Sequence, residues 1–239
     1  MRILVATAHR NLVGGVEKYL QALIPGLEEH GHELGLLHEY QATPGRETID
    51  LPPHGLTRTW CLAESPASTV LHSVAEWAPD VVYHHGFDRP DSIAVEDALV
   101  SAYSAALYVH NYDRTCGTGQ QCFMFPQPKL CQREIGPMCL VLHYPRRCGG
   151  LHPGVMWQRY RRHMALHARL PQYQAVLVAS SHMHRQLAKT SGLAGKLCLA
   201  PLPATGMVLQ FPPAVPKPFT DKILFVGRLT NLKGADGVI

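Results

Sequence analysis

Two adjacent glycines stand where a phosphate group could bind. Gly14 and Gly15 lie between an apolar run, residues 2–8, and a stretch with helical periodicity. Glycines at such a junction let the backbone approach a ligand, and the free N–H groups at a helix start attract anions. A tight turn without a ligand explains the pair equally well. The pattern is not the dinucleotide fingerprint G-x-G-x-x-G, which has a third glycine inside the helix.

A histidine ends each of two apolar runs in the first half of the chain. His110 follows residues 105–109, and His84 and His85 end the preceding run. A histidine at the carboxyl end of a buried strand can act as a general base or orient a substrate hydroxyl. The alternative is a histidine that only caps local backbone groups, and with 15 histidines in the chain that alternative applies to any one of them.

Two cations lie close together near the end of the chain. Arg228 and Lys233 follow the apolar run 222–227 within the sequence Gly-Arg-Leu-Thr-Asn-Leu-Lys-Gly. Fixed cations beside backbone N–H groups form a diphosphate clamp. Two solvated surface cations are the alternative.

Five of the seven cysteines fall within one stretch, the cysteine-rich insertion (residues 112–150). No C-x-x-C pair is present, so the spacing is not that of a standard zinc ribbon. A structural zinc ion held by four of the five is the interpretation we prefer for a cytosolic chain. Disulfides and inert buried thiols are the alternatives. The five residues are Cys116, Cys122, Cys131, Cys139 and Cys148.

A basic stretch with aromatic residues covers residues 154–170 and has helical periodicity. It carries four arginines together with Trp157 and Tyr160. Such a helix can lie on anionic lipid headgroups. A helix packed on a sheet with its arginines in water is the alternative.

The elements that must position these residues alternate along the chain. Strands are expected at 2–8, 33–39, 80–85, 105–110, 175–179 and 196–200, and helices at 16–30, 67–77, 92–101, 154–170 and 181–191. Pro25 should kink or interrupt the first helix. The alternation predicts an α/β fold with a Rossmann-like doubly wound parallel sheet, whose functional crevice lies at the carboxyl ends of the strands. A closed eight-stranded barrel would need a more regular repeat.

The domain organisation follows from a break in this pattern. Six prolines occupy residues 201–221, which suits a semi-rigid linker. We therefore expect a first domain at 1–200, a linker at 201–221, and the first strand and turn of a second Rossmann-like domain at 222–239.

The amino-acid composition narrows the class of protein further. The chain has 239 residues, of which 46% are hydrophobic, and this excludes wholesale disorder. No apolar run reaches the roughly 20 residues that cross a bilayer, and the N-terminus lacks a signal-peptide pattern, so we expect a cytoplasmic protein. Residues 1–110 hold 6 Lys+Arg and 14 Asp+Glu, whereas residues 111–239 hold 16 and 4. The basic second half predicts an anionic partner.

Taken together, these motifs resemble those of the family 4 (group 1) retaining glycosyltransferases, which have the GT-B fold. The resemblance spans nearly the whole chain: a G-G-V-E motif after the first strand, strands that end in histidine, a strand running into a Ser-bearing helix start, and an F-x-G-R-L-x-x-x-K-G motif that opens the second domain. These motifs correspond here to residues 14–17, His85 and His110, residues 176–181, and residues 225–234.

The resemblance implies a role for each matched residue. Gly14 and Gly15 would line the donor diphosphate, His110 would touch the sugar near the reacting centre, and Arg228 and Lys233 would neutralise the departing β-phosphate. Catalysis would need no metal, which agrees with the absence of an Asp-x-Asp motif. The donor would be a nucleotide-diphosphate sugar and the acceptor a glycan or lipid-linked molecule, with peripheral contact at the inner face of the membrane through 154–170.

The sequence departs from the family in two respects, of which the first is Pro201-Leu202-Pro203 where members often have an Asn-Gly turn. In the family's second domain an E-x7-E motif follows the F-x-G-R-L-x-x-x-K-G motif, and no such motif follows residue 234 here. We therefore expect the N-terminal portion of such an enzyme, with uncertain activity as an isolated chain. A non-catalytic acceptor-binding or zinc-stabilised module that needs a separate C-terminal partner is the alternative. A nucleic-acid-binding protein ranks last, and no nucleic acid is expected as a partner, because no helix-turn-helix or finger spacing is present.

Overall fold

The computed structural model describes residues 1–49 and 56–202. Its first compact unit is Met1–Pro203 and its second is Ala204–Ile239. Arg228, Lys233 and nearly all of the expected linker therefore lie outside the described residues.

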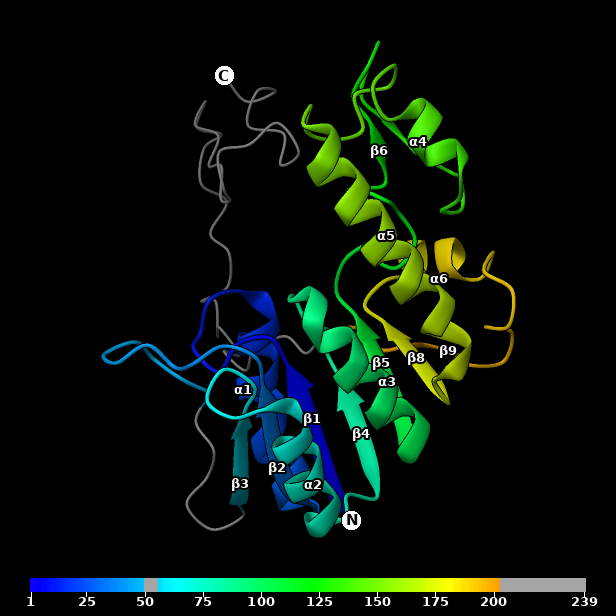
Figure 1. Cartoon of the computed structure of the whole chain (residues 1–239). Helices are drawn as coiled ribbons and strands as arrows, with labels where there is room; N and C mark the ends of the chain where they lie inside the picture. Colours follow the sequence, from blue (N-terminus) through cyan, green and yellow to red (C-terminus); the bar gives the residue numbers. More distant parts are fainter. Residues whose placement is uncertain (50–55, 203–239) are drawn as a thin grey trace, which may run out of the picture. The chain divides into compact units, whose positions relative to one another are not determined.

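The centre of the fold is a seven-stranded parallel sheet with the order β3-β2-β1-β4-β5-β8-β9 (Figure 1). The chain runs outward from β1 through β2 to β3, and then returns to β4 on the other side of β1. The topological switch point lies between β1 and β4, where ligands of open α/β sheets bind. The strands are β1 (Arg2–Thr7), β2 (Glu33–His38), β3 (Leu56–Cys61), β4 (Val81–His84), β5 (Ser104–Val109), β8 (Ala175–Val178) and β9 (Leu197–Leu199).

Helices cover both faces of this sheet, as the doubly wound prediction requires. Figure 1 shows α1 on one face, with α2 and α3 on the other. Short 3-10 turns, η1 and η2, precede α3 and follow α5. The helical elements are α1 (Gly15–Glu29), α2 (Ala67–Trp77), η1 (Pro90–Ser92), α3 (Ile93–Ala102), α4 (Met138–Leu142), α5 (Pro153–Arg169), η2 (Leu170–Gln172) and α6 (Ser181–Leu187).

Alternate residues of each strand enter two separate cores. In β5, Leu107 and Val109 face the core under α2 and α3, whereas Tyr108 faces the core under α1. The period of two along a strand sends neighbouring side chains to opposite faces. A residue that follows a strand therefore continues this alternation, which decides where each histidine at the sheet edge points.

The predicted elements agree with the structure in kind, and most ends agree within two residues. Helix α1 runs through Pro25, so of the expected kink or interruption the interruption does not occur. Helix α6 ends at Leu187, four residues earlier than predicted. Strand β3 was not predicted, because polar residues occupy its middle, Thr57–Thr59. The hairpin β6 (Cys122–Phe123) with β7 (Lys129–Leu130), and helix α4, are also additional elements of the cysteine-rich insertion.

Candidate functional site

A cavity of about 120 Å³ opens at the switch point, where the carboxyl ends of β1, β4 and β5 meet. The first residues beyond these strands include His9, His85 and His110, and all three line the cavity. Helix α5 contributes Arg162 and Leu166 to the same cavity. The structure thus brings the predicted His110 to the predicted edge of the sheet.

His110 is directly bonded to a second histidine. Its Nε2 lies 2.8 Å from Nδ1 of His85, and the two ring centroids are 5.1 Å apart. The Tyr108 ring stacks on His85 with the ring centroids 5.9 Å apart, and it lies tilted against His110 at 4.7 Å. Burial lowers the pKa of His110 to about 4. Burial, and then the neighbouring His110, lower the pKa of His85 well below its ordinary value. Both imidazoles are therefore neutral at pH 7, so each carries one donor and one acceptor nitrogen.

Two tyrosines fix the floor beneath this pair. The hydroxyls of Tyr19 on α1 and Tyr83 on β4 are 2.8 Å apart. Burial raises the pKa of both phenols, so they remain neutral. Tyr19 also touches the rings of His85 and His110, at 5.6 and 5.9 Å between centroids. The histidine pair is thus held between α1 and the sheet.

An acidic residue faces the third histidine of the cavity. Asp88 Oδ2 lies 3.8 Å from Nε2 of His9, whose ring stacks on Tyr40 at 4.7 Å. The fully buried Glu39 accepts hydrogen bonds from the backbone N–H groups of Asp88, at 2.5 Å, and Arg89, at 3.1 Å. Sequence reasoning missed His9, although it lies two residues after the end of β1, close to the same edge at which His85 follows β4. That position was the available signal.

A buried ion pair supports the cavity from the other side of the sheet. Arg114 Nη1 lies 2.8 Å from Glu96 Oε1, and Tyr173 donates a hydrogen bond to the same carboxylate at 2.7 Å. Burial would raise the pKa of Glu96, but Arg114 and His84 lower it to about 2. His84 is fully buried here, with its Nε2 4.0 Å from Glu96. Of the two histidines that end β4, His84 therefore belongs to the core and His85 to the cavity.

The glycine pair begins helix α1 but does not line the cavity. Gly14 donates its N–H to the carboxylate of Glu17 at 2.8 Å, and Gly14 and Gly15 are both exposed. A Cβ at Gly15 would meet nothing within 4 Å. Val16 and Glu17, the next residues, do line the cavity. The predicted phosphate site is thus open to solvent, and a carboxylate already accepts one of its N–H groups.

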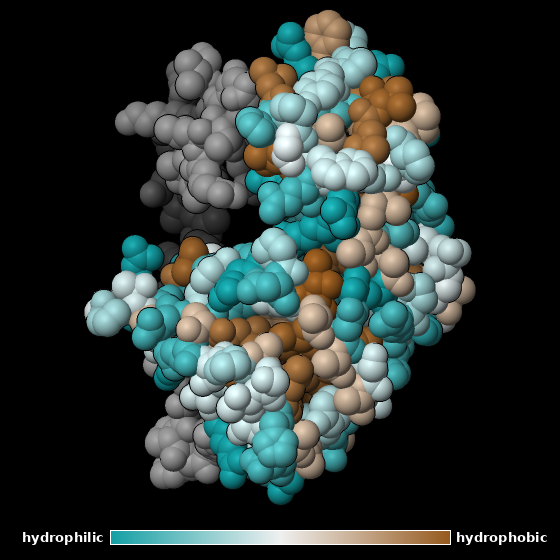
Figure 2. Space-filling model, in the orientation of Figure 1, coloured by the Kyte–Doolittle hydropathy of each residue, from teal (hydrophilic) through white to brown (hydrophobic). Residues whose placement is uncertain are grey.

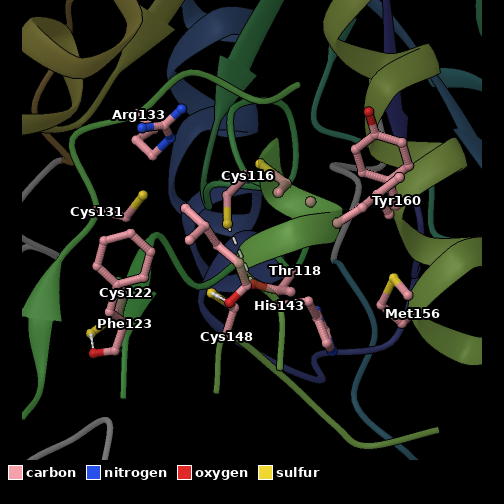
Figure 3. A pocket seen from close by; sticks show the side chains of 14 residues that line it. Cys116, Thr118, Cys122, Phe123, Cys131, Arg133, His143, Cys148, Met156 and Tyr160 are labelled. Atoms are coloured by element: carbon pink, nitrogen blue, oxygen red, sulfur yellow. Dashed lines mark hydrogen bonds between the residues drawn. The ribbon is translucent and has the colours of Figure 1, made fainter. Parts of the chain in front are cut away.

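The five cysteines of the cysteine-rich insertion line a second, smaller cavity of about 30 Å³ (Figure 3). All are free thiols. Burial raises the pKa of Cys148 to about 11, and the other four thiols add to this rise. As their side chains stand, no three His, Cys, Asp or Glu residues of the described chain are placed to hold a metal ion.

Helix α5 and the cysteine-rich insertion carry exposed apolar side chains. Val141 in the insertion is 62% exposed, and Val155 and Trp157 in α5 are 48% and 50% exposed. Figure 2 shows hydrophobic surface over the cysteine-rich insertion. Within the described ranges, no helix has the length and apolarity that crossing a membrane requires.

The fold and this edge define a doubly wound α/β protein with a histidine-lined cavity at its switch point. No family model matches the sequence, and no curated protein matches it. Solved structures with a similar arrangement include TcCGT1 in complex with UDP, at 13% identity and a TM-score of 0.47, over 85% of this chain and 51% of that one. They also include a UGT transferase from Siraitia grosvenorii in complex with UDP, at 11% identity and a TM-score of 0.44, over 85% and 51%.

A third such structure is Os79 from O. sativa in complex with UDP, at 12% identity and a TM-score of 0.43, over 86% of this chain and 52% of that one. The chain therefore spans about half the length of the structures it matches. Likeness at this level assigns neither a family nor an activity.

Proposed function

We propose that the chain supplies the acceptor-side domain of a glycosyltransferase that moves a sugar from a nucleotide-diphosphate sugar to a glycan or lipid-linked acceptor. The observation that carries the proposal is the neutral pair His85–His110 in the cavity at the switch point. The sequence motifs at residues 14–17 and 225–234 support it, and they favour the retaining family 4 type.

His110 is suited to bind a sugar hydroxyl rather than to supply charge. Its low pKa keeps it neutral at pH 7, and His85 occupies its Nε2. In the proposed reaction the bond between the anomeric carbon and the β-phosphate oxygen breaks, and its electron pair leaves with the nucleoside diphosphate. The acceptor oxygen bonds to that carbon, and its proton passes to the departing diphosphate. Arg228, Lys233 and the start of α1 at Gly14 and Gly15 would stabilise the leaving diphosphate without a metal.

A transfer assay with a panel of nucleotide-diphosphate sugars tests the proposal. The protein is this chain and, where the coding sequence continues beyond residue 239, the longer product. Expected results are binding of at least one donor, measured by calorimetry, and release of nucleoside diphosphate that depends on an added glycan or polyprenyl-phosphate acceptor. If no donor binds to the longest product and none is consumed, the proposal is wrong.

A non-catalytic acceptor-binding module is the second candidate. It is favoured by the Glu17 carboxylate at the Gly14 N–H, because a diphosphate would have to displace or approach this negative charge. Wild-type protein that binds an acceptor but none of the donors in the panel would support the module and exclude the enzyme.

We also propose that the start of α5 contacts an anionic membrane surface. Val155 and Trp157 are exposed there, next to the exposed Arg159 and Arg161. Exposed apolar side chains beside cations bind lipid headgroups with a strength that rises with anionic lipid. We expect the R159E/R161E variant to lose co-sedimentation with phosphatidylglycerol vesicles.

The matched control for this experiment is R46E/R58E, which changes the charge equally at two exposed arginines elsewhere. Wild-type binding that is the same for neutral and anionic vesicles would contradict the membrane proposal.

A further inference from the structure

The cavity in the cysteine-rich insertion is lined by five thiols that come from separate stretches of chain. Cys116 follows β5, Cys122 and Cys131 belong to the β6–β7 hairpin and its end, Cys139 lies in α4, and Cys148 precedes α5. Figure 3 shows Cys122 and Cys131 on one side of the cavity, with Met156 and Tyr160 of α5 on the other. The fold thus gathers residues that are up to 32 positions apart in the sequence.

The size of the cavity limits what can occupy it. A volume of about 30 Å³ corresponds to a single water molecule or ion. An organic cofactor needs roughly ten times that space. A single ion with thiol ligands fits the volume and the chemistry of the lining.

The cysteine-rich insertion also lacks a core of its own. Within residues 116–150, all of which the structure describes, Ile135 is the one buried apolar side chain, and the five cysteines are half-buried. Its regular elements are two strands of two residues and one helix of five. Segments of this size hold a single conformation when a disulfide or a metal ion joins distant positions.

We propose that Cys116, Cys131, Cys139 and Cys148 bind one structural zinc ion. Four thiolates in tetrahedral arrangement form a closed structural site. Binding releases the four thiol protons and leaves the centre with a net charge of −2, with no change in oxidation state. Arg133, which lines the cavity, offsets part of this charge. The site is independent of the sugar-transfer proposal.

The hydrogen bonds of the thiols decide which cysteine is left out. Cys122 donates its S–H to the carbonyl of its neighbour Phe123 at 3.2 Å, the shortest bond from a thiol donor among the five cysteines, whereas the S–H of Cys148 lies 3.7 Å from the Leu142 carbonyl and is more easily freed. Cys116 accepts the backbone N–H of Gln121 at 3.3 Å, a bond that stabilises a thiolate. Cys139 lies against the turn that follows Cys116, because a Cβ atom at Gly117 would be 3.7 Å from the Cβ atom of Cys139.

The thiols rim the cavity and do not yet converge on one point. Zinc–sulfur bonds of about 2.3 Å therefore require the cysteine side chains to turn toward the centre. A cysteine has one side-chain torsion that moves its sulfur, and its three staggered positions make such a turn available.

Metal analysis of protein purified without chelator tests the proposal. We expect about one zinc ion per chain in the wild type and in the matched control C122S, and a several-fold lower content in C148S. Cobalt substituted for zinc in the wild type should give the strong visible absorption of a tetrahedral thiolate site, a readout that does not depend on the folding of C148S.

Each other result overturns part or all of the proposal. Folded wild-type protein without metal excludes the site, and mass spectrometry would then show whether disulfides join the thiols instead. If the analysis finds iron and the protein shows a charge-transfer spectrum, the cysteines hold an iron–sulfur centre instead of zinc. Equal loss of zinc in C122S and C148S shows that the assigned set of four ligands is wrong.

Discussion

The sheet edge and the cysteine-rich insertion adjoin each other, yet they are stabilised in different ways. At the sheet edge, β1 places Leu4, Val5 and Ala6 at 0–1% exposure, and the histidines follow such buried strands. In the cysteine-rich insertion, Val141 is 62% exposed and Leu130 53%. The first region is ordered by hydrophobic burial, and the second has thiols where a core would otherwise be. The sheet edge is thus the region that can hold the side chains of a site in fixed positions.

The largest expected effect is on catalysis at the sheet edge. Replacing His110 by Ala removes the group that we propose contacts the sugar, and we expect a 10²- to 10⁴-fold loss of transfer rate. Steady-state rates with the donor identified by the panel measure this. The control His72→Ala removes an exposed histidine on α2 and should leave the rate unchanged. Equal rates in wild type and His110→Ala would remove His110 from the site.

The next effect concerns the junction between the two regions. Arg114 begins the cysteine-rich insertion but pairs with Glu96 inside the core of the sheet. Arg114→Met leaves the Glu96 carboxylate buried and unpaired, and we expect a loss of about 3–5 kcal/mol in the free energy of unfolding. Urea denaturation measures it.

The double variant Arg114→Met/Glu96→Gln should recover part of that loss, because no uncompensated buried charge remains. A double variant as unstable as the sum of two severe single changes would contradict this account of the junction.

A pair of truncations compares the two regions directly. Leu107 in β5 is 1% exposed, and Leu107→Ala should lower the free energy of unfolding by about 2–5 kcal/mol. Val141 in α4 is 62% exposed, and Val141→Ala should change it by less than about 0.5 kcal/mol. Similar losses in both variants would show that the cysteine-rich insertion has an apolar core after all.

The smallest effect is a pH dependence. The pKa of His110 is about 4 in the folded chain and 6.5 when exposed, so the unfolded chain takes up a proton first as pH falls. The contribution of neutral His110 to the free energy of unfolding is therefore complete above pH 6.5, and it is lost as the pH falls from 6.5 to 4. We expect His110→Gln to weaken this acid dependence by about 1–2 kcal/mol. Unfolding free energies at several pH values measure it, and identical slopes would contradict the shifted pKa.

The two regions also differ in how far sequence reasoning reached. Apolar runs predicted the strands because burial on both faces leaves a continuous pattern, and strand order then placed His110 at the crevice. That His85, rather than His84, meets His110 depends on the pleat of β4, which an apolar run does not reveal. The Glu96–Arg114 pair joins residues 18 apart through tertiary packing, and no local pattern encodes it.

In the cysteine-rich insertion, the spacing of the cysteines showed that they were grouped, but it could not show that all five line one cavity. Its short elements have too few residues for a periodic signal. The roles given to Gly14, Gly15, Arg228 and Lys233 remain predictions, and the last two lie outside the described residues.

Helix α5 forms a wall of both cavities. Met156 and Tyr160 line the cysteine cavity, while Arg162 and Leu166, one to two turns further on, line the histidine cavity. Arg162 also donates a hydrogen bond to the Phe87 carbonyl at 2.5 Å. The helix is about 25 Å long. If a ligand at the thiols tilted the helix, Arg162 would be displaced as well, and each cavity's ligand would then change the affinity of the other by the same factor.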